Sequence, residues 1–224
     1  MMTDNSNLQP DQLIVSEIYL SLQGESTLAG LPCILVRLVG CNLACSWCDT
    51  LHAREEAGTI MSISEIVARV ESLGCNRVEL TGGEPLMQSA SEKLLKSLCE
   101  AGFETIIETN GSFDISNLDP RVKRIVDIKC PESLMQDKNL LSNLNCLTKN
   151  DEIKCVIASK EDFNFAVNVV KSHNLLEKCS VIFSPVWNKA TPAELSEWII
   201  TSKLDIRMGL QLHKIIWPDL DRGV

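Results

Sequence analysis

Residues 77–85 are Arg-Val-Glu-Leu-Thr-Gly-Gly-Glu-Pro, an apolar β-type run that passes directly into a glycine-rich turn. Ser89 and Glu92 follow with the S/T-x-x-E spacing of a helix capping box, which predicts a helix after the turn. Gly102 then stands where a helix end favours glycine, and another β-type run begins at Thr105. The stretch therefore predicts a strand–helix–strand unit with a loop at the carboxyl end of its first strand.

The same alternation extends in both directions along the chain. Capping-box spacing recurs at Ser62 with Glu65 and at Thr191 with Glu194, and a mixed run at 13–22 predicts an additional antiparallel N-terminal strand. Alternating strands and helices predict a parallel sheet with right-handed crossovers, either doubly wound or closed into a partial barrel. The further β-type runs lie at residues 33–39, 105–108, 125–128, 152–157, 180–183 and 206–212.

Chemically unusual motifs follow five of these predicted strands. Because the carboxyl ends of parallel strands share one edge, we expect all five motifs to converge there. A site to which several adjacent strands contribute favours a partial barrel over a doubly wound sheet, which binds its ligand in a single crevice. The motifs are residues 41–48, 81–85, 108–111, 129–131 and 184–187.

Length and composition restrict the class of protein. The chain has 224 residues without a linker or composition shift, which predicts a single domain over residues 1–224. A formal net charge of -9 argues against binding nucleic acid, whose phosphates would be repelled. No apolar run approaches a membrane span, and residues 1–10 are polar, which predicts a cytoplasmic protein.

Ten cysteines are unusual for a chain that is expected in a reducing compartment. Cys41, Cys45 and Cys48 form a C-x3-C-x2-C motif, and three thiolates this close can surround one metal centre. A structural zinc site needs a fourth ligand, which His52 or a distant cysteine could supply. A four-iron cluster on three cysteines instead keeps one open position for a ligand. The seven dispersed cysteines are expected as small buried hydrophobes: Cys33, Cys75, Cys99, Cys130, Cys146, Cys155 and Cys179.

The cysteine motif, with Trp47 before its third cysteine and Thr81-Gly82-Gly83-Glu84-Pro85 further on, resembles the radical S-adenosylmethionine (SAM) superfamily. The resemblance implies an α/β fold, a partial (β/α)6 barrel of the radical SAM type, here with an N-terminal extension strand. It also implies a 4Fe–4S cluster on Cys41, Cys45 and Cys48 whose open iron binds SAM. One electron from the cluster then yields a 5′-deoxyadenosyl radical that abstracts hydrogen from an unactivated carbon. The alternative for residues 81–85 is a simple tight turn.

A narrower resemblance rests on residues 17–25 (Glu-Ile-Tyr-Leu-Ser-Leu-Gln-Gly-Glu), 37–43 and 47–50 (Trp-Cys-Asp-Thr). These stretches are similar to the 7-carboxy-7-deazaguanine synthase family. The resemblance implies a carbon–nitrogen lyase of queuosine and 7-deazapurine biosynthesis, which converts 6-carboxy-5,6,7,8-tetrahydropterin to 7-carboxy-7-deazaguanine with loss of ammonia. It further implies a homodimer that receives electrons from flavodoxin or ferredoxin. The alternative is a glycyl-radical enzyme activase, a class that lacks the Gln-Gly-Glu loop paired with Arg37.

The resemblance implies roles for individual residues as well. Thr50 would be the protein ligand of Mg2+, with water and substrate completing its shell. Arg37 would hold the substrate carboxylate with its planar fork. The full set that would bind substrate is Leu22, Gln23, Gly24, Glu25, Arg37 and Thr81. The set that would bind SAM is Trp47, Cys48, Asp49, Gly83, Glu84, Lys129, Cys130, Pro131, Ser184, Pro185 and Val186.

Several of these residues also have a purely structural interpretation. Arg37 could pair with Glu17 or Glu25 across the sheet, and Thr50 could cap a helix or turn. Glu84 could accept backbone N–H bonds instead of contacting the cofactor.

The C-terminal part of the chain leaves two interpretations open. His213 follows the run at 206–212 and is either a structural histidine or a wall of the site. Some relatives end in a proline whose carboxyl region closes over the substrate, whereas this chain continues from Pro218 to Val224.

Overall fold

The computed structural model describes residues 8–220 and 222–224. Within them one mixed sheet has the strand order β3-β1-β2-β4-β5-β6-β7-β8-β9. Strands from β2 through β4 to β9 pair in parallel, and β1 pairs antiparallel with both β2 and β3. The strands are β1 Gln12–Leu22, β2 Pro32–Leu38, β3 Thr59–Ser62, β4 Arg77–Gly82, β5 Glu104–Thr109, β6 Lys123–Asp127, β7 Glu152–Ile157, β8 Ser180–Pro185 and β9 Arg207–Met208.

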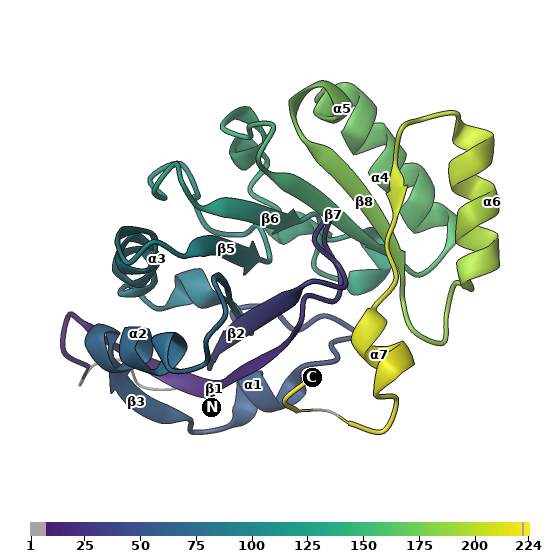
Figure 1. The fold of residues 1–224 in the computed structure, drawn as a ribbon. Coiled ribbons are helices and arrows are strands. Elements are labelled where there is room, and N and C mark those ends of the chain that lie inside the picture. Colours follow the sequence, from purple (N-terminus) through teal and green to yellow (C-terminus); the bar gives the residue numbers. More distant parts are fainter. Residues whose placement is uncertain (1–7, 221) are drawn as a thin grey trace.

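The larger helices lie around the outside of this curved sheet (Figure 1). Because β3 and β9 are its two edges, the sheet does not close, which confirms a partial barrel. The antiparallel N-terminal strand predicted over residues 13–22 is confirmed as β1. The helices are α1 Leu51–Glu55, α2 Ile63–Glu71, α3 Ser91–Glu100, α4 Lys160–Ser172, α5 Leu175–Lys178, α6 Pro192–Ser202 and α7 Leu212–Ile216.

Helix starts follow the capping signals in two of the three predicted boxes. The Ser62 side chain accepts from the backbone N–H of Glu65, and Glu65 bonds back to the Ser62 N–H. Thr191 and Glu194 form the same reciprocal pair at α6. Each box satisfies donors that have no partner inside the helix, so both helices begin where the sequence predicts.

The capping box predicted at Ser89 and Glu92 is wrong. Helix α3 begins at Ser91, and its N-cap residue Ala90 makes no side-chain capping bond. The preceding residues form a 3₁₀ turn, after which the Gln88 side chain bonds to the backbone of Ile14 and Val39. These bonds to β1 and to the residue after β2 fix the chain up to Gln88 and delay the start of the helix.

The strand predicted at 206–212 is also mostly wrong. Only Arg207 and Met208 pair with β8, and Gly209 already turns away after its N–H bonds to Phe183 O. The N–H of Leu212 then bonds to Gly24 O, so the chain enters helix α7 beside the loop after β1. Ile206 belongs to the hydrophobic core, whereas Leu210 is exposed, so the apolar residues here do not form one continuous strand.

The hydrophobic core lies between the sheet and the outer helices. The ring of Phe183 in β8 is fully buried and meets Phe163 of α4 edge-on, with ring centroids 5.7 Å apart. Trp198 of α6 packs on the same Phe163 ring at 5.8 Å. In the described ranges no helix is both long and apolar enough to span a membrane.

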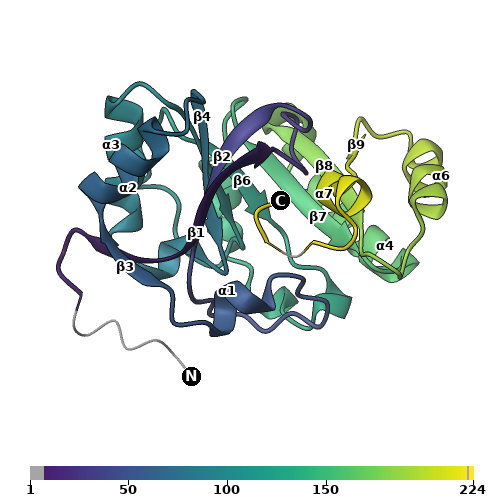
Figure 2. The same ribbon diagram turned by 60° about the horizontal axis from the view of Figure 1, so that its bottom comes forward.

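Helix α7 and the C-terminal residues lie on the concave side of the sheet, opposite the outer helices (Figure 2). The Tyr19 hydroxyl of β1 donates to Val224 O at 2.8 Å, and the Gly223 N–H donates to Glu17 Oε2 at 3.1 Å. The last residues therefore return to the first strand and close one side of the barrel interior.

Candidate active site

A cavity of about 510 Å³ lies at the carboxyl ends of the parallel strands. Each of the five motifs singled out in the sequence contributes to its wall, through Cys41, Thr81, Glu108, Lys129 and Val186. The predicted convergence is therefore confirmed. It follows from the parallel arrangement, which places all of these strand ends on one edge.

The strands place mainly charged and polar side chains in the barrel interior and apolar side chains in the hydrophobic core. Residues on one face of each strand enter the cavity, and their sequence neighbours enter the hydrophobic core. The cavity side is Leu35, Arg37, Glu79, Thr81, Glu108, Asp127, Lys154 and Val156. The core side includes Val36, Leu38, Leu80, Ile107, Val126, Cys155 and Ile157.

Cys41, Cys45 and Cys48 all line this cavity. Burial raises the pKa of the Cys41 and Cys45 thiols, while Lys129 opposes the shift at both. The Leu43 N–H and the Asn110 side-chain amide point at Cys41 Sγ, at 3.4 and 3.8 Å. Such donors suit a sulfur that carries negative charge as a metal ligand.

The arrangement of these thiols fits an iron–sulfur cluster. Over residues 8–220 and 222–224, no three His, Cys, Asp or Glu side chains converge closely enough to hold one metal ion. The three thiols are spread over the cavity wall, and His52, the candidate fourth zinc ligand, lies 3.7 Å from Glu17 Oε1. Three donors around a shared space fit a multi-iron centre with one open position better than a closed zinc site.

Two features beside the cysteines fit a bound cofactor. Trp47 Nε1 is buried and has no hydrogen-bond partner among the residues described, although Trp47 lines the cavity. Buried donors in native proteins normally have partners, so this N–H is available to a ligand. Lys129 Nζ lies 5.7 Å from the centre of the Trp47 ring and 2.7 Å from Asp127 Oδ2.

Gly83 brings the loop after β4 against the cysteine loop. A Cβ at this position would lie 2.3 Å from Gly40 O and 2.8 Å from Cys41 Cβ. The Gly83 N–H bonds to Leu38 O, and the Glu84 N–H bonds to Gly40 O. Only glycine allows the two loops to come this close. The contact fixes the position of Cys41 relative to the glycine-rich turn.

We expect Gly83→Ala to separate these loops and lower the amount of iron that the protein retains after reconstitution. The clash should cost ~1–3 kcal/mol, as overpacking of a tight contact usually does. Iron per chain and the midpoint of denaturant unfolding measure the two effects. Gly74→Ala is the control for iron content only. No atom stands within 4 Å of the added Cβ, but φ is +67° there, so this substitution also costs stability. Equal iron in both variants would show that the Gly83 contact does not position the cysteines.

Five of the residues predicted to bind SAM do not line the cavity: Glu84, Cys130, Pro131, Ser184 and Pro185. Glu84 is fully buried and accepts from Thr109 Oγ1 and from the backbone N–H groups of Leu86 and Asn110. Burial raises the pKa of its carboxyl to about 7. Glu84 thus makes the backbone contacts that its structural interpretation expects, and it holds the loop that carries Asn110.

Arg37 has the cross-strand partner that was one of its two interpretations. Its Nε donates to Glu17 Oε1 at 2.9 Å, and its Nη2 donates to the Tyr19 hydroxyl at 3.0 Å. These bonds leave Nη1 without a hydrogen-bond partner among the described residues. Because Arg37 also lines the cavity, the fork is fixed on one side and available on the other.

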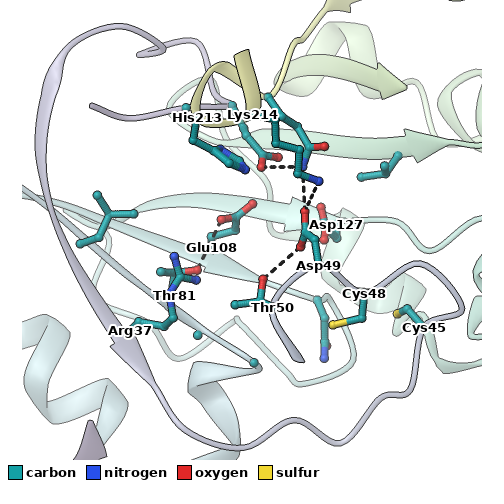
Figure 3. A pocket seen from close by; sticks show the side chains of 18 of the residues that line it. Arg37, Cys45, Cys48, Asp49, Thr50, Thr81, Glu108, Asp127, His213 and Lys214 are labelled. Atoms are coloured by element: carbon teal, nitrogen blue, oxygen red, sulfur yellow. Dashed lines mark hydrogen bonds and ion pairs between the residues drawn. The ribbon is translucent and has the colours of Figure 1, made fainter. Parts of the chain in front are cut away.

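Asp49 and Thr50 lie between the cysteines and Arg37 (Figure 3). Thr50 stands at the N-cap position of α1, but its hydroxyl makes no capping bond and donates to Asp49 Oδ1 at 3.0 Å. Asp49 Oδ2 accepts from Lys214 Nζ at 2.6 Å and from Gln211 at 3.1 Å. Although burial opposes ionisation, Lys214 holds the pKa of Asp49 well below its usual range.

The Gln-Gly-Glu loop forms another part of the cavity wall. Gln23 Oε1 accepts from the backbone N–H groups of Glu25 and Ser26, at 2.9 and 2.8 Å. These two hydrogen bonds fix the orientation of the Gln23 side-chain amide within the loop. His213 packs on Gly24, where a Cβ would lie 3.0 Å from His213 Nδ1, and lines the cavity as the site-wall interpretation expected.

Sequence reasoning missed a charged network on the cavity floor. The ammonium of Lys154 in β7 bonds to Glu25 Oε2 at 2.9 Å and to Glu108 Oε1, and lies 3.6 Å from Asp127 Oδ1. Burial opposes the charge on Lys154, but these carboxylates raise its pKa well above the usual value. The sequence did contain a signal for this network: charged residues occur at every second position within strands that are otherwise apolar.

The chain is similar to known proteins over most of its length. Residues 35–131 match the model of the radical SAM superfamily. The chain is 45% identical to a 7-carboxy-7-deazaguanine synthase of Chlorobaculum tepidum, across 95% of this chain and 97% of that protein. It is 41% identical to the protein of the same name from Koribacter versatilis, across 94% and 99%.

Two solved structures share the fold. The crystal structure of QueE from Escherichia coli superposes with a TM-score of 0.69 at 24% identity, and covers 89% of this chain and 94% of that one. Streptococcus suis SuiB, bound to the precursor peptide SuiA, gives a TM-score of 0.57 at 12% identity, across 79% and 47%. Both likenesses concern the fold alone.

Proposed function

This chain belongs to the 7-carboxy-7-deazaguanine synthase family of radical SAM enzymes, and from that membership we infer that it forms 7-carboxy-7-deazaguanine. The proposed substrate is 6-carboxy-5,6,7,8-tetrahydropterin, which loses ammonia as its ring contracts. One observation carries the proposal: a single cavity is lined by the three cysteines, the glycine-rich turn, Arg37 and the Gln-Gly-Glu loop.

The cofactor half of the cavity is proposed around the cysteine loop. Cys41, Cys45 and Cys48 would hold a 4Fe–4S cluster. When bound, the cluster and SAM supply the radical that removes hydrogen from the substrate. Protein groups available to orient SAM are the Trp47 N–H, which has no partner among the described residues, the backbone at Gly83, Asp49, Lys129 and Val186. Four further residues lie behind the cavity wall and would position the neighbouring residues that contact SAM: Cys130, Pro131, Ser184 and Pro185.

The substrate half is proposed around Arg37. Its free Nη1 edge suits a carboxylate, and the ion pair with Glu17 fixes the guanidinium plane in advance. Leu22, Gly24 and Glu25 of the loop, together with Thr81, complete this side of the wall. Thr50 is proposed as the protein ligand of Mg2+, since its hydroxyl is not used for capping and lies between the two halves.

We further propose that residues 1–224 form a single radical SAM domain that acts as a homodimer. The continuous sheet from β3 to β9 supports the single domain. The proposed reductant is flavodoxin or ferredoxin, and the proposed compartment is the cytoplasm. All ten cysteines are free, as a reducing compartment requires.

The direct test is anaerobic turnover. The protein is reconstituted with iron and sulfide and supplied with SAM, Mg2+, a strong reductant and 6-carboxytetrahydropterin. We expect 7-carboxy-7-deazaguanine in the mass spectrum. If only 5′-deoxyadenosine appears, the substrate assignment is wrong and the glycyl-radical activase becomes the better hypothesis.

A further inference from the structure

Glu79 is an acidic residue in the cavity wall for which none of the assignments above accounts. It lies in β4, two residues before Thr81, and faces the cavity although only 2% of its surface is exposed. Its Oε2 accepts a hydrogen bond from Gln23 Nε2 at 3.0 Å. No described residue bonds to its Oε1.

Every other acidic residue of the wall faces a cation. Lys214 pairs with Asp49, and Lys129 pairs with Asp127. Lys154 pairs with both Glu25 and Glu108. Glu79 has no ion pair within the part of the chain that the structure describes, and its neighbours include Glu25 and Glu108, the two carboxylates that pair with Lys154.

These surroundings favour the protonated form of Glu79. Burial contributes most, and the Glu108 carboxylate adds to it, so that the pKa of Glu79 rises to about 8. Gln23 and Lys154 oppose the shift, and Glu25 supports it. The titratable and charged groups around Glu79 are Glu108 from β5, Lys154 from β7, Glu25 from the loop, Arg37 and Cys33 from β2 and Tyr19 from β1.

The hydrogen bond to Gln23 decides which oxygen carries the proton. Gln23 Oε1 already accepts two backbone N–H groups, so its amide cannot turn to accept from Glu79. Glu79 Oε2 is therefore an acceptor, and the proton resides on Oε1. The side chain presents an O–H donor in a wall whose other carboxylates present only acceptors.

We propose that Glu79 is a specificity-determining residue that, as a neutral carboxylic acid, donates a hydrogen bond to an acceptor atom on the substrate ring. The inference rests on the proposed function, because the ring is that of the pterin. The ionised carboxylates of the wall suit the amino and ring N–H donors of such a heterocycle, and Glu79 suits a carbonyl oxygen or ring nitrogen. An ionised Glu79 would lose its donor and would also repel an anionic substrate.

The test compares substrate affinity across pH for the wild-type enzyme, Glu79→Gln and Glu79→Leu. Glu79→Gln keeps a neutral donor that cannot titrate, with its carbonyl still available to Gln23. We expect the wild-type dissociation constant to rise about tenfold per pH unit above the Glu79 pKa. Glu79→Gln should lose this alkaline limb, and Glu79→Leu should bind at least ~10-fold more weakly at neutral pH. Iron content and circular dichroism confirm that each variant is folded and loaded.

A second readout is independent of the substrate. The infrared C=O stretch of a carboxyl that titrates near pH 8 should be present in the substrate-free wild-type enzyme and lost in Glu79→Gln. The buried Glu84 carboxyl, whose pKa is about 7, gives its own band, which both proteins retain and which Glu84→Gln identifies. Wild-type affinity that is constant or increases with pH, or Glu79→Leu binding as well as wild type, would overturn the role of Glu79. Absence of product from the wild-type enzyme would instead overturn the proposed function, and with it the ligand named here.

Discussion

We expect Cys45→Ala to yield a folded protein that retains no four-iron cluster and forms neither 5′-deoxyadenosine nor 7-carboxy-7-deazaguanine. The expected loss is complete, because a cluster with three protein ligands has none to spare. Cys45 lines the cavity and stands between Cys41 and Cys48 on one loop. Iron and sulfide per chain, the visible absorption of the cluster and product formation are measured after the same anaerobic reconstitution.

Cys75→Ala is the matched control for this loss. Cys75 is a free cysteine of intermediate exposure whose thiol donates to Pro32 O at 3.4 Å, and it does not line the cavity. It should retain iron and activity at the wild-type level. A Cys45→Ala protein with wild-type iron would refute the assignment of the three cysteines, and zinc in place of iron would refute the enzyme assignment.

Arg37→Ala should abolish pterin turnover and leave the cluster intact. Hydrogen bonds to charged groups contribute ~1.5–3 kcal/mol each, so loss of a forked contact to a carboxylate corresponds to at least ~10²-fold in kcat/KM. Cys45 and Cys48 lie on the opposite side of the cavity from Arg37 (Figure 3), so iron content should not change. Steady-state kinetics with 6-carboxytetrahydropterin, at matched iron content, gives the effect.

Two companion variants separate binding from folding. Glu17→Gln removes the ion-pair partner but keeps the guanidinium, so its activity should fall much less than that of Arg37→Ala. Arg37→Lys keeps the charge but loses the fork and should remain strongly impaired. Wild-type turnover by Arg37→Ala would remove the main support for the carboxylate contact.

The fold could largely be predicted from sequence because its signals are local. Apolar runs, capping pairs and glycines at helix ends each act within a few residues, and most of the predicted strands and two of three capping boxes are confirmed. The predictions that are wrong lie where distant contacts decide. Gln88 delays α3 by bonding to Ile14 and Val39, and Gly24 draws Leu212 into α7.

The site was predictable only in part, for the same reason. The cysteine loop and glycine-rich turn are contiguous motifs, and both line the cavity. Lys154 and Glu79 are single charged residues within strands, and their importance depends on distant partners. Lys154 bonds to Glu108 and Glu25, 46 and 129 residues away, and Glu79 bonds to Gln23, 56 residues away. Glu84 belongs to a recognisable motif, but its direction is set by Thr109 and Asn110, which no local pattern indicates.

The contacts of residues 211–220 and 222–224 with the first strands and with the cysteine loop bear on how the protein folds. Gln211 bonds to Glu25, Lys214 to Asp49 and Val224 to Tyr19, at sequence separations of 186, 165 and 205 residues. Contacts of such high contact order close late, because the entropy of forming a long loop must be met before they form. During synthesis the cysteine loop leaves the ribosome long before these residues. A metal centre inserted at that stage would enter a barrel that still lacks its C-terminal segment.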